Sequence, residues 1–210
     1  MKDAAPSVAR RRAPSQSRSQ TTVDAILEAT AALLVERGYE GVNTNAVAQR
    51  AEVKPPAVYR YFPNKFALYF ALAEKLQGEL DIVLDAALAQ ADGRPFAAVI
   101  DALIDGAAAF WERRPAFAAL WYGQWAITGA PAPALLFGER TISRFSAATA
   151  RFRHLGPARE RMALAAAMQI GIAIVNLAAL SGPEDRPFMI GEAKRALLSY
   201  LLPLADPALL

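Results

Sequence analysis

The side chains that most often carry out catalysis are scarce in this sequence. Its single histidine, His154, lies beside Arg151 and Arg153, and no serine or carboxylate is spaced to complete a catalytic triad with it. Cysteine is absent, which excludes thiolate nucleophiles, disulfide bonds and cysteine-ligated zinc. The sequence also lacks a glycine-rich phosphate-binding loop. This inventory predicts that the protein is not an enzyme and uses no cofactor.

Two pairs of aspartates have a spacing that could place their carboxylates together at a metal site. Asp81 and Asp85 are four residues apart, as are Asp101 and Asp105, so each pair shares one face of a helix. Two carboxylates on one face can contribute to a metal site. Without histidine partners such pairs are more often part of a solvated face. We therefore expect no metal.

Positive charge is concentrated at the start of the chain. Residues 1–65 hold 3 Lys and 7 Arg against 2 Asp and 4 Glu, a formal charge of +4, whereas the remainder carries −1. A basic segment favours a polyanion partner, because neutralised phosphates release counterions. Taken alone, the same charge fits a solvated tail equally well. Residues 1–18 have no hydrophobic periodicity and are predicted to form a disordered basic arm.

The first helix is expected to begin near Thr22. Apolar positions recur there at spacings of three and four residues and form one stripe. Gly38 suits the left-handed backbone that ends a helix. The members of the stripe are Val23, Ile26, Leu27, Thr30, Leu33 and Leu34.

A second helix is predicted from Asn43 to Ala51, with Asn43 as its N-cap and Val47 and Ala48 facing inward. On this helix Asn45 and Gln49, four residues apart, should face outward.

A tight turn over residues 52–56 leads to a third helix, which should begin at Pro56 because Pro55 is itself followed by proline. Val58 and Phe62 are expected to point inward, and Ala57 and Tyr61 to lie on the opposite side with Tyr59 on a flank. Two short helices joined by a tight turn are the layout of a helix-turn-helix.

The rest of the chain is predicted to be helical as well. With 210 residues and 54% hydrophobic content, the chain can bury a sizeable core. Proline and glycine residues at the expected breaks divide it into six further helices. Apolar and polar residues do not alternate for long enough to predict a β-sheet. The fold class is therefore all-α, with about nine helices in a helix-turn-helix domain at residues 19–65 and a larger domain at 66–210. The six helices are expected near residues 65–91, 95–113, 115–128, 133–154, 157–181 and 187–202.

Residues 162–180 form a long apolar stretch whose clearly polar members are Gln169 and Asn176. A membrane span is one reading of its length. The stretch is dominated by alanine and glycine and lacks an aromatic belt, which favours a helix buried on nearly all sides in a protein with no membrane contact. Its small residues would allow another helix to approach closely: Ala163, Ala166, Ala167, Gly171 and Ala178.

Residues 22–65 resemble the DNA-binding domain of the TetR (tetracycline-repressor) family of bacterial regulators. The resemblance rests on the spacing of several features, listed in order: Ile26-Leu27-Glu28-Ala29, Gly38-Tyr39, Asn43-Thr44, Val47-Ala48, Ala51, Val53, Val58-Tyr59-Arg60-Tyr61-Phe62 and Lys65. The sequence departs from the family pattern in two places. Glu52 stands where glycine is usual, and residues 54–57 replace a start of the recognition helix that usually contains serine and glycine.

The resemblance implies that the second and third helices contact double-stranded operator DNA. Thr44 would then bind a phosphate at a helix N-terminus, and Asn45 would pair with a base edge. Pro56 and Ala57 offer apolar surface to a thymine methyl group, and Lys54 could reach guanine or phosphate. The predicted DNA-binding residues are Thr44, Asn45, Lys54, Pro55, Pro56, Ala57, Tyr59, Tyr61 and Lys65. Arg10, Arg11, Arg12 and Arg18 either track the DNA or are merely solvated.

The resemblance also implies a homodimer and a sensor domain. The dimer would form through residues 157–181 and 187–202 and bind a near-palindromic operator. A small hydrophobic or aromatic effector would bind the larger domain, move the helix that begins at Lys65 and release the DNA. The expected function is a ligand-responsive regulator of transcription, more often a repressor, in the cytoplasm.

Aromatic density in the middle of the chain suggests where an effector binds, although each ring is individually more typical of core. The predicted pocket residues are Phe70, Phe110, Trp111, Trp121, Tyr122, Trp125, Phe137, Gln169 and Asn176. A helical small-molecule carrier without DNA recognition is the alternative, which salt-dependent DNA binding would distinguish.

Overall fold

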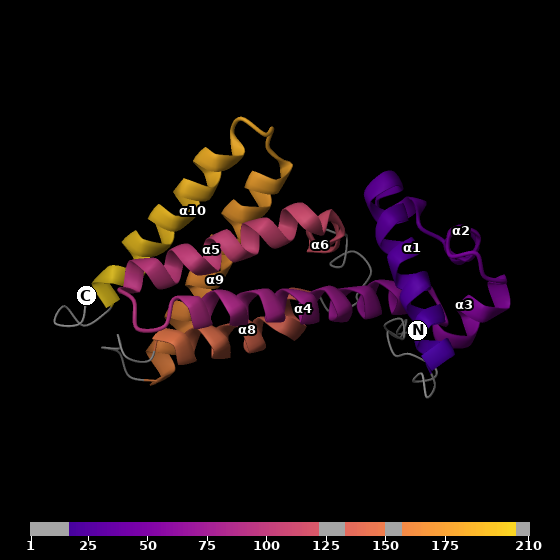
Figure 1. Ribbon diagram of the computed structural model, residues 1–210, viewed down its shortest axis with the longest axis horizontal. Helices are drawn as coiled ribbons and strands as arrows, with labels where there is room; N and C mark the ends of the chain where they lie inside the picture. Colours follow the sequence, from indigo (N-terminus) through magenta and orange to yellow (C-terminus); the bar gives the residue numbers. More distant parts are fainter. Residues whose placement is uncertain (1–16, 122–132, 150–156, 205–210) are drawn as a thin grey trace, which may run out of the picture. The chain divides into compact units, whose positions relative to one another are not determined.

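The computed structural model describes residues 17–121, 133–149 and 157–204, and the regular structure in these ranges is helical (Figure 1). The α-helices of the described part are α1 Ser17–Gly41, α2 Thr44–Arg50, α3 Pro55–Tyr61, α4 Lys65–Gln90, α5 Phe96–Arg113, α6 Pro115–Trp121, α8 Pro133–Thr149, α9 Pro157–Leu180 and α10 Arg186–Leu201. A 3-10 turn, η2, covers Leu202–Leu204. The all-α prediction is confirmed. The predicted helix ends at 122–128 and 150–154 lie outside the described residues.

The chain divides into two compact units, which we describe separately. The first comprises residues 1–77 and 115–136, and the second comprises residues 78–114 and 137–210. Helix α4 contributes its first half to one unit and its second half to the other. The functional domain boundary at residue 65 stays a prediction, because compactness alone does not define a functional domain.

Helix α1 forms the core of the first unit. Every member of its predicted apolar stripe, from Val23 to Leu34, is buried. The helix begins at Ser17, earlier than the expected Thr22. Its first residues are polar in sequence and carry no hydrophobic periodicity, and Gln20 Nε2 donates a hydrogen bond to Asp24 Oδ2 at 3.2 Å. Gly38 has a φ of 68° and breaks the helix there, as predicted.

Helix α2 is capped at both ends by local chemistry. The side chain of Asn43 accepts a hydrogen bond from the Ala46 amide at 2.9 Å, which confirms Asn43 as the N-cap. At the other end the Val53 amide donates to the Ala48 carbonyl at 3.0 Å, and the Glu52 amide donates to the Gln49 carbonyl at 3.2 Å. This is a Schellman motif, and it requires a positive φ at Glu52, which is 54°. A non-glycine residue there costs about 1 kcal/mol.

Helix α3 begins at Pro55, one residue before the predicted start. Both prolines lie in the first turn, where an amide hydrogen would have no acceptor within the helix, so the missing N–H groups cost the helix nothing. Val58 and Phe62 are fully buried, as expected. Helix α4 then begins behind Asn64, whose Oδ1 accepts a hydrogen bond from the Ala67 amide at 3.0 Å.

In the second unit, α9 and α10 run side by side and α5 packs against both (Figure 1). Gly171 of α9 allows this approach, because a Cβ at that position would lie 3.3 Å from Leu197 Cδ1. The predicted role of small residues in α9 is confirmed at this point. Ion pairs add to the packing: Lys194 Nζ lies 2.8 Å from Asp105 and 3.8 Å from Asp101.

The expectation that α9 is buried on nearly all sides is wrong for the single chain. Residues 159–180 have a mean hydropathy of 2.0 in their most apolar stretch, and a third of that stretch is buried. Met162 is 73% exposed and Leu180 is 71% exposed. Length and composition alone would allow this helix to cross a membrane, but an apolar core helix passes the same test. One long face of α9 therefore lacks a covering element among the described residues.

Candidate nucleic-acid interface

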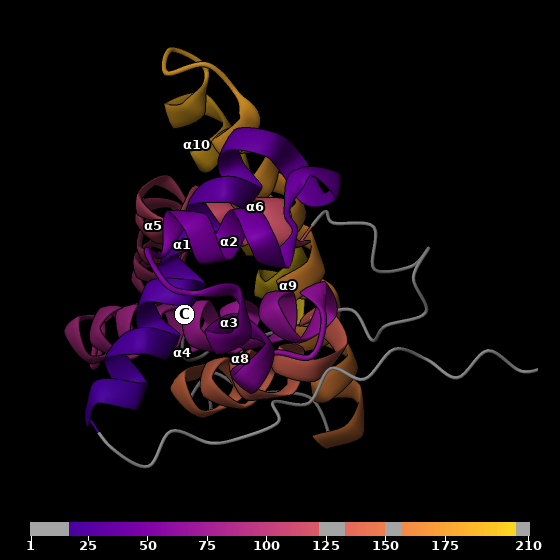
Figure 2. The same ribbon diagram turned by 90° about the vertical axis from the view of Figure 1, so that its right-hand side faces the viewer.

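Helices α2 and α3 belong to the first unit (Figure 2), and both carry exposed residues. Asn45 and Gln49 are exposed on α2, as predicted from their spacing. The start of α3 is exposed as well, at Lys54, Pro55 and Pro56, with Ala57 half-buried behind them. Most of the residues predicted to contact DNA are thus accessible on adjacent helices.

A side-chain hydrogen bond joins the two helices of this face. Thr44 Oγ1 donates to Tyr59 Oη at 2.7 Å, between residues at the start of α2 and in the middle of α3. The phenol can then donate its own hydrogen to a further acceptor, because Oη accepts from Thr44 and keeps its O–H. Tyr59 is 44% exposed, so an incoming phosphate oxygen has access to it. The two residues form one paired donor site.

Tyr61 does not lie on this face, so the expectation of an outward-facing Tyr61 is wrong. Its side chain is 4% exposed. Residues 58 and 61 are three apart and share a helix face, so Tyr61 follows Val58 toward the core. Its ring packs near Phe62, with centroids 6.4 Å apart, and the Arg60 guanidinium lies 5.4 Å from its centroid. Tyr61 supports α3 from within.

Lys65 lies at the start of α4, and its ammonium group contacts two side chains of the free protein. Its Nζ is 3.3 Å from Glu40 Oε2 and 5.0 Å from the centroid of the Tyr39 ring. The side chain remains 30% exposed, which leaves the ammonium accessible to a phosphate. Glu40 is a residue that sequence reasoning missed, because 25 positions separate the pair and no local spacing indicates it.

A second acidic residue of α1 also pairs with a cation of this unit. Glu36 accepts two hydrogen bonds from Arg50, at 2.6 and 3.0 Å. The hydrogen bond from Arg50 holds the pKa of Glu36 below its ordinary value, and the same bond raises the pKa of Arg50. This ion pair joins the end of α2 to α1. Arg50 is therefore bound to Glu36 in the free protein.

The residues predicted to line an effector pocket divide between the units. Phe70 is half-buried in the first unit, and Phe110 and Trp111 are buried in the second. Trp111 Nε1 donates a hydrogen bond to Oδ1 of the fully buried Asn176, whose Nδ2 has no hydrogen-bond partner among the described residues. The side chains of Trp121, Tyr122, Trp125 and Phe137 lie outside the described residues, as does His154.

Gln169 does not belong to an enclosed pocket within one chain, because its side chain is exposed. It lies on the open face of α9 that also carries Met162, Leu177 and Leu180. Helical periodicity explains the position, since residues 162, 169, 173, 177 and 180 share one side of a helix. Gln169 and Asn176 are seven residues apart and therefore lie near the same side of α9, but Gln169 is exposed and Asn176 is fully buried.

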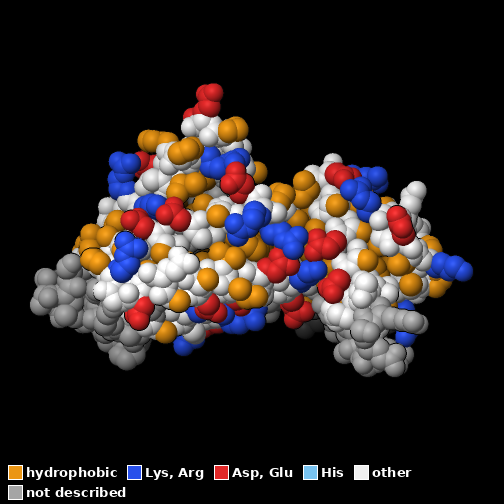
Figure 3. Space-filling view, in the orientation of Figure 1, with side chains coloured by type: hydrophobic (Ala, Val, Ile, Leu, Met, Phe, Trp, Pro, Cys, Tyr) orange, Lys and Arg blue, Asp and Glu red, His pale blue; other side chains and the backbone are white. Residues whose placement is uncertain are grey.

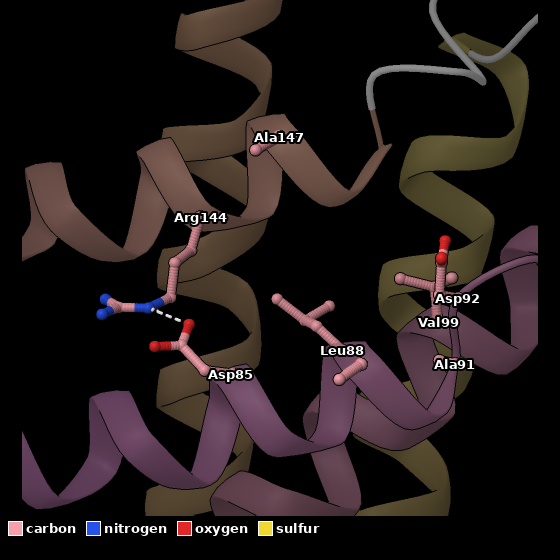
Figure 4. Close-up of a pocket in the computed structure, with 8 residues that line it drawn as sticks. Asp85, Leu88, Ala91, Asp92, Val99, Arg144 and Ala147 are labelled. Carbon is pink, nitrogen blue, oxygen red and sulfur yellow. Dashed lines mark hydrogen bonds and ion pairs between the residues drawn. The ribbon is translucent and has the colours of Figure 1, made fainter.

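A separate cavity of about 420 Å³ lies in the second unit between the end of α4 and α8 (Figure 4). Leu88 lies at its centre, with Ala147 on the α8 side. Arg144 reaches across from α8 to Asp85 at 2.5 Å and also contacts Asp81 at 2.9 Å. These bonds raise the pKa of Arg144, the hydrogen bond to Asp85 having the largest effect.

The aspartates that the sequence analysis considered as metal ligands form ion pairs with basic side chains. Asp81 and Asp85 bind Arg144, and Asp101 and Asp105 face Lys194, so each pair forms ion pairs with a cation. Within the described ranges, no group of three or more metal-ligating side chains lies together.

Family models match both parts of the chain. The model described as bacterial regulatory proteins, tetR family, matches residues 26–72, and the model described as tetracyclin repressor-like, C-terminal domain, matches residues 95–201. The first match covers α2 and α3 with their supporting helices, and the second covers more than half of the chain. The protein belongs to the TetR family of bacterial transcriptional regulators.

Similar proteins include transcriptional regulators from other bacteria. The transcriptional repressor KstR of Mycolicibacterium smegmatis is 41% identical over 71 residues, which is 34% of each chain. A TetR-family regulator from Streptomyces coelicolor is 27% identical, with a TM-score of 0.71, over 87% of this chain and 99% of its own. SmeT, which represses a Stenotrophomonas maltophilia multidrug efflux pump, shares the fold at 17% identity, with a TM-score of 0.67, over 91% and 94% of the two chains. The chain spans about a third of the length of the curated relatives it matches.

Proposed function

We propose that this protein is a transcriptional regulator, acting as a repressor, that binds a near-palindromic operator through the exposed face of α2 and α3. The observation that carries the proposal is the paired donor site of Thr44 and Tyr59, which lies beside the exposed Asn45. The phenol of Tyr59, which keeps its own hydrogen, would donate to a phosphate and help to set the register of the helices on the duplex. Asn45 would then read an adenine in the major groove.

The start of α3 contributes a different kind of contact. Pro55, Pro56 and Ala57 have no side-chain hydrogen-bond donors, so their readout would be apolar contact with thymine methyl groups. Lys54 is exposed and would bind guanine or a nearby phosphate. Lys65 would bind a phosphate on the flank. We expect a preference for A·T-containing half-sites as a result.

The protein is proposed to act as a homodimer through α9 and α10. One such domain buries too little surface for tight specific binding, and two domains must lie about 34 Å apart or a multiple of one DNA turn. The support is the open apolar face of this helix pair. The exposed large apolar side chains of the two helices are Met162, Leu177 and Leu180 on α9 and Phe188 and Tyr200 on α10. Figure 3 shows hydrophobic side chains gathered at the end of the α9–α10 pair, which suits an obligate interface.

A small hydrophobic or aromatic effector is proposed to bind the second unit and release the DNA. The support is the buried polar pair of Trp111 and Asn176 beside Phe110, whose ring centroid is 6.0 Å from that of Trp111. An unpartnered buried amide nitrogen costs about 1 to 3 kcal/mol, and an acceptor atom on a ligand would remove that cost. The effector must favour the DNA-free state by several kcal/mol.

We place the protein in the cytoplasm, where its operator is, and assign it no enzymatic activity. The carrier alternative would keep an effector site but would show no salt-dependent DNA binding.

The test is selection of bound sequences from a pool of random duplexes by wild-type protein and by Tyr59→Phe. Recovery of a two-fold-symmetric sequence by wild type, and weaker recovery of the same sequence by the variant, is the expected result. Recovery of no consensus would reject the proposal. Operator release by small molecules, followed in a thermal-shift and DNA-release screen, tests the effector separately.

A further inference from the structure

The ammonium group of Lys65 is held between a carboxylate and two aromatic rings. Besides Glu40 and the Tyr39 ring, the ring of Phe66 lies near it, with its centroid 6.0 Å from Nζ. Glu40 is on the short helical segment that follows the break at Gly38. Its side chain is 73% exposed, so its carboxylate faces the same solvent from which a phosphate would approach.

The backbone beneath this pair is firmly anchored. The rings of Tyr39 and Tyr69 stack with centroids 4.6 Å apart, and Tyr69 Oη donates to the Tyr39 carbonyl at 2.6 Å. Burial of Tyr69 raises the pKa of its phenol, which keeps this donor protonated. These contacts hold the backbone at residue 39, next to Glu40, against α4. The exchange proposed below needs only the side chains of Glu40 and Lys65 to move.

We propose that Glu40 is an internal substitute for a DNA phosphate. In the free protein its carboxylate binds the ammonium of Lys65, and on DNA a phosphate oxygen takes its place. The inference rests on the proposed DNA-binding function and adds a regulating residue to it. Glu40 thereby lowers affinity for duplexes of any sequence, which limits the nonspecific binding that competes with an operator.

The exchange is physically reasonable because both partners of Lys65 are oxyanions and the existing pair is exposed. Exposed pairs are weak, so a phosphate can displace the carboxylate. Opening the Glu40–Lys65 pair takes up part of the free energy that the phosphate contact would release. Removing the charge of Glu40 should therefore tighten DNA binding about two- to fivefold at low salt, and salt should reduce the gain because it screens exposed charges.

The experiment measures binding of full-length protein to a fluorescent random-sequence duplex of about 30 base pairs, or three turns. Fluorescence anisotropy is recorded between about 50 and 200 mM salt, where phosphate contacts respond strongly. Wild type is compared with Glu40→Gln and with the control Glu74→Gln. Glu74 is exposed on α4 and carries the same charge. We expect the gain for Glu40→Gln only, with a smaller gain at higher salt.

A double variant separates exchange from simple repulsion. If Glu40 acts by occupying Lys65, Glu40→Gln should have little effect in a Lys65→Gln background. Circular dichroism confirms that each variant is folded. Wild-type binding with no gain for Glu40→Gln, or with an equal gain in the Lys65→Gln background, overturns this inference and leaves the proposed function intact. Absence of any wild-type binding to DNA overturns both.

Discussion

Thr44 and Tyr59 are joined by a hydrogen bond of 2.7 Å that connects the first residue of α2 to the middle of α3. Neither residue belongs to the other's helix, so the bond fixes the relative position of the two helices at their exposed face. It leaves the phenol hydrogen of Tyr59 available to a further acceptor, because Oη accepts from Thr44.

Removal of this hydrogen bond should weaken DNA binding more than folding. Thr44→Val keeps the side-chain shape and deletes the hydroxyl, and Tyr59→Phe deletes its partner. Each change should weaken operator binding about three- to tenfold, which corresponds to the net value of one typical hydrogen bond, about 1 kcal/mol. Because the two groups act together, the double variant should lose less than the product of the single losses. Anisotropy titration with the selected operator measures this, and fully multiplicative losses would contradict the pairing.

The turn between α2 and α3 offers a stability test. Glu52 has a φ of 54°, a conformation that glycine adopts at no steric cost. Glu52→Gly should raise the free energy of unfolding by about 1 kcal/mol, measured by urea denaturation. Glu52→Ala is the matched control, because it removes the charge but retains the Cβ. An equal gain for alanine would show that charge, not backbone strain, is responsible.

The buried pair in the second unit predicts coupled stabilities. Trp111→Phe deletes the donor to Asn176 and leaves the amide with no described partner, which should cost about 2 kcal/mol beyond the lost volume. Asn176→Leu removes the polar group itself. The cost of Trp111→Phe should therefore be smaller in the Asn176→Leu background. Chemical denaturation of the four proteins gives the coupling, and a value of zero would contradict the hydrogen bond.

The open face of α9 predicts the oligomeric state. Leu180→Glu places a charge on that face and should shift the protein toward monomer in analytical ultracentrifugation. Ile82→Glu on α4 is the matched control, since Ile82 and Leu180 are both 71% exposed. The control should remain a dimer. A dimer that tolerates Leu180→Glu but dissociates with Ile82→Glu would assign the interface to another surface.

Lys75 of α4 predicts a pH dependence in the first unit. Burial lowers the pKa of Lys75, but the carboxylates of Glu28 and Asp24, at 2.8 and 3.4 Å, outweigh burial and raise it overall. A raised lysine pKa adds stability that is fully present below the unfolded value of about 10.4 and is lost as the pH rises through the folded pKa. The stability difference between wild type and Lys75→Gln should be constant near neutral pH and shrink above that value. A difference that grows with pH would contradict the ion pair.

Local chemistry made much of the first unit predictable. The buried stripe of α1, the break at Gly38 and the cap at Asn43 follow from side-chain spacing and backbone preference alone. Tyr61 was misplaced because a helix of seven residues has a broad buried face, and the residue three positions after Val58 falls within it. The polar start of α1 was missed because exposed turns have no hydrophobic pattern.

Contacts between distant residues were beyond the reach of the sequence. Glu40 and Lys65 lie 25 positions apart, and Trp111 and Asn176 lie 65 apart, so their pairing depends on how whole helices pack. The exposure of α9 has another cause: an apolar helix has the same composition whether its own chain or a second chain covers it.

The central claim is that the exposed face of α2 and α3 binds operator DNA. Nuclease footprinting on the DNA upstream of the protein's own gene tests this claim most directly. The account predicts protection of a near-palindromic site, lost on raising the salt and lost in an Asn45→Ala, Tyr59→Phe double variant that remains folded. A footprint unchanged in that variant, or no footprint at low salt, would contradict it.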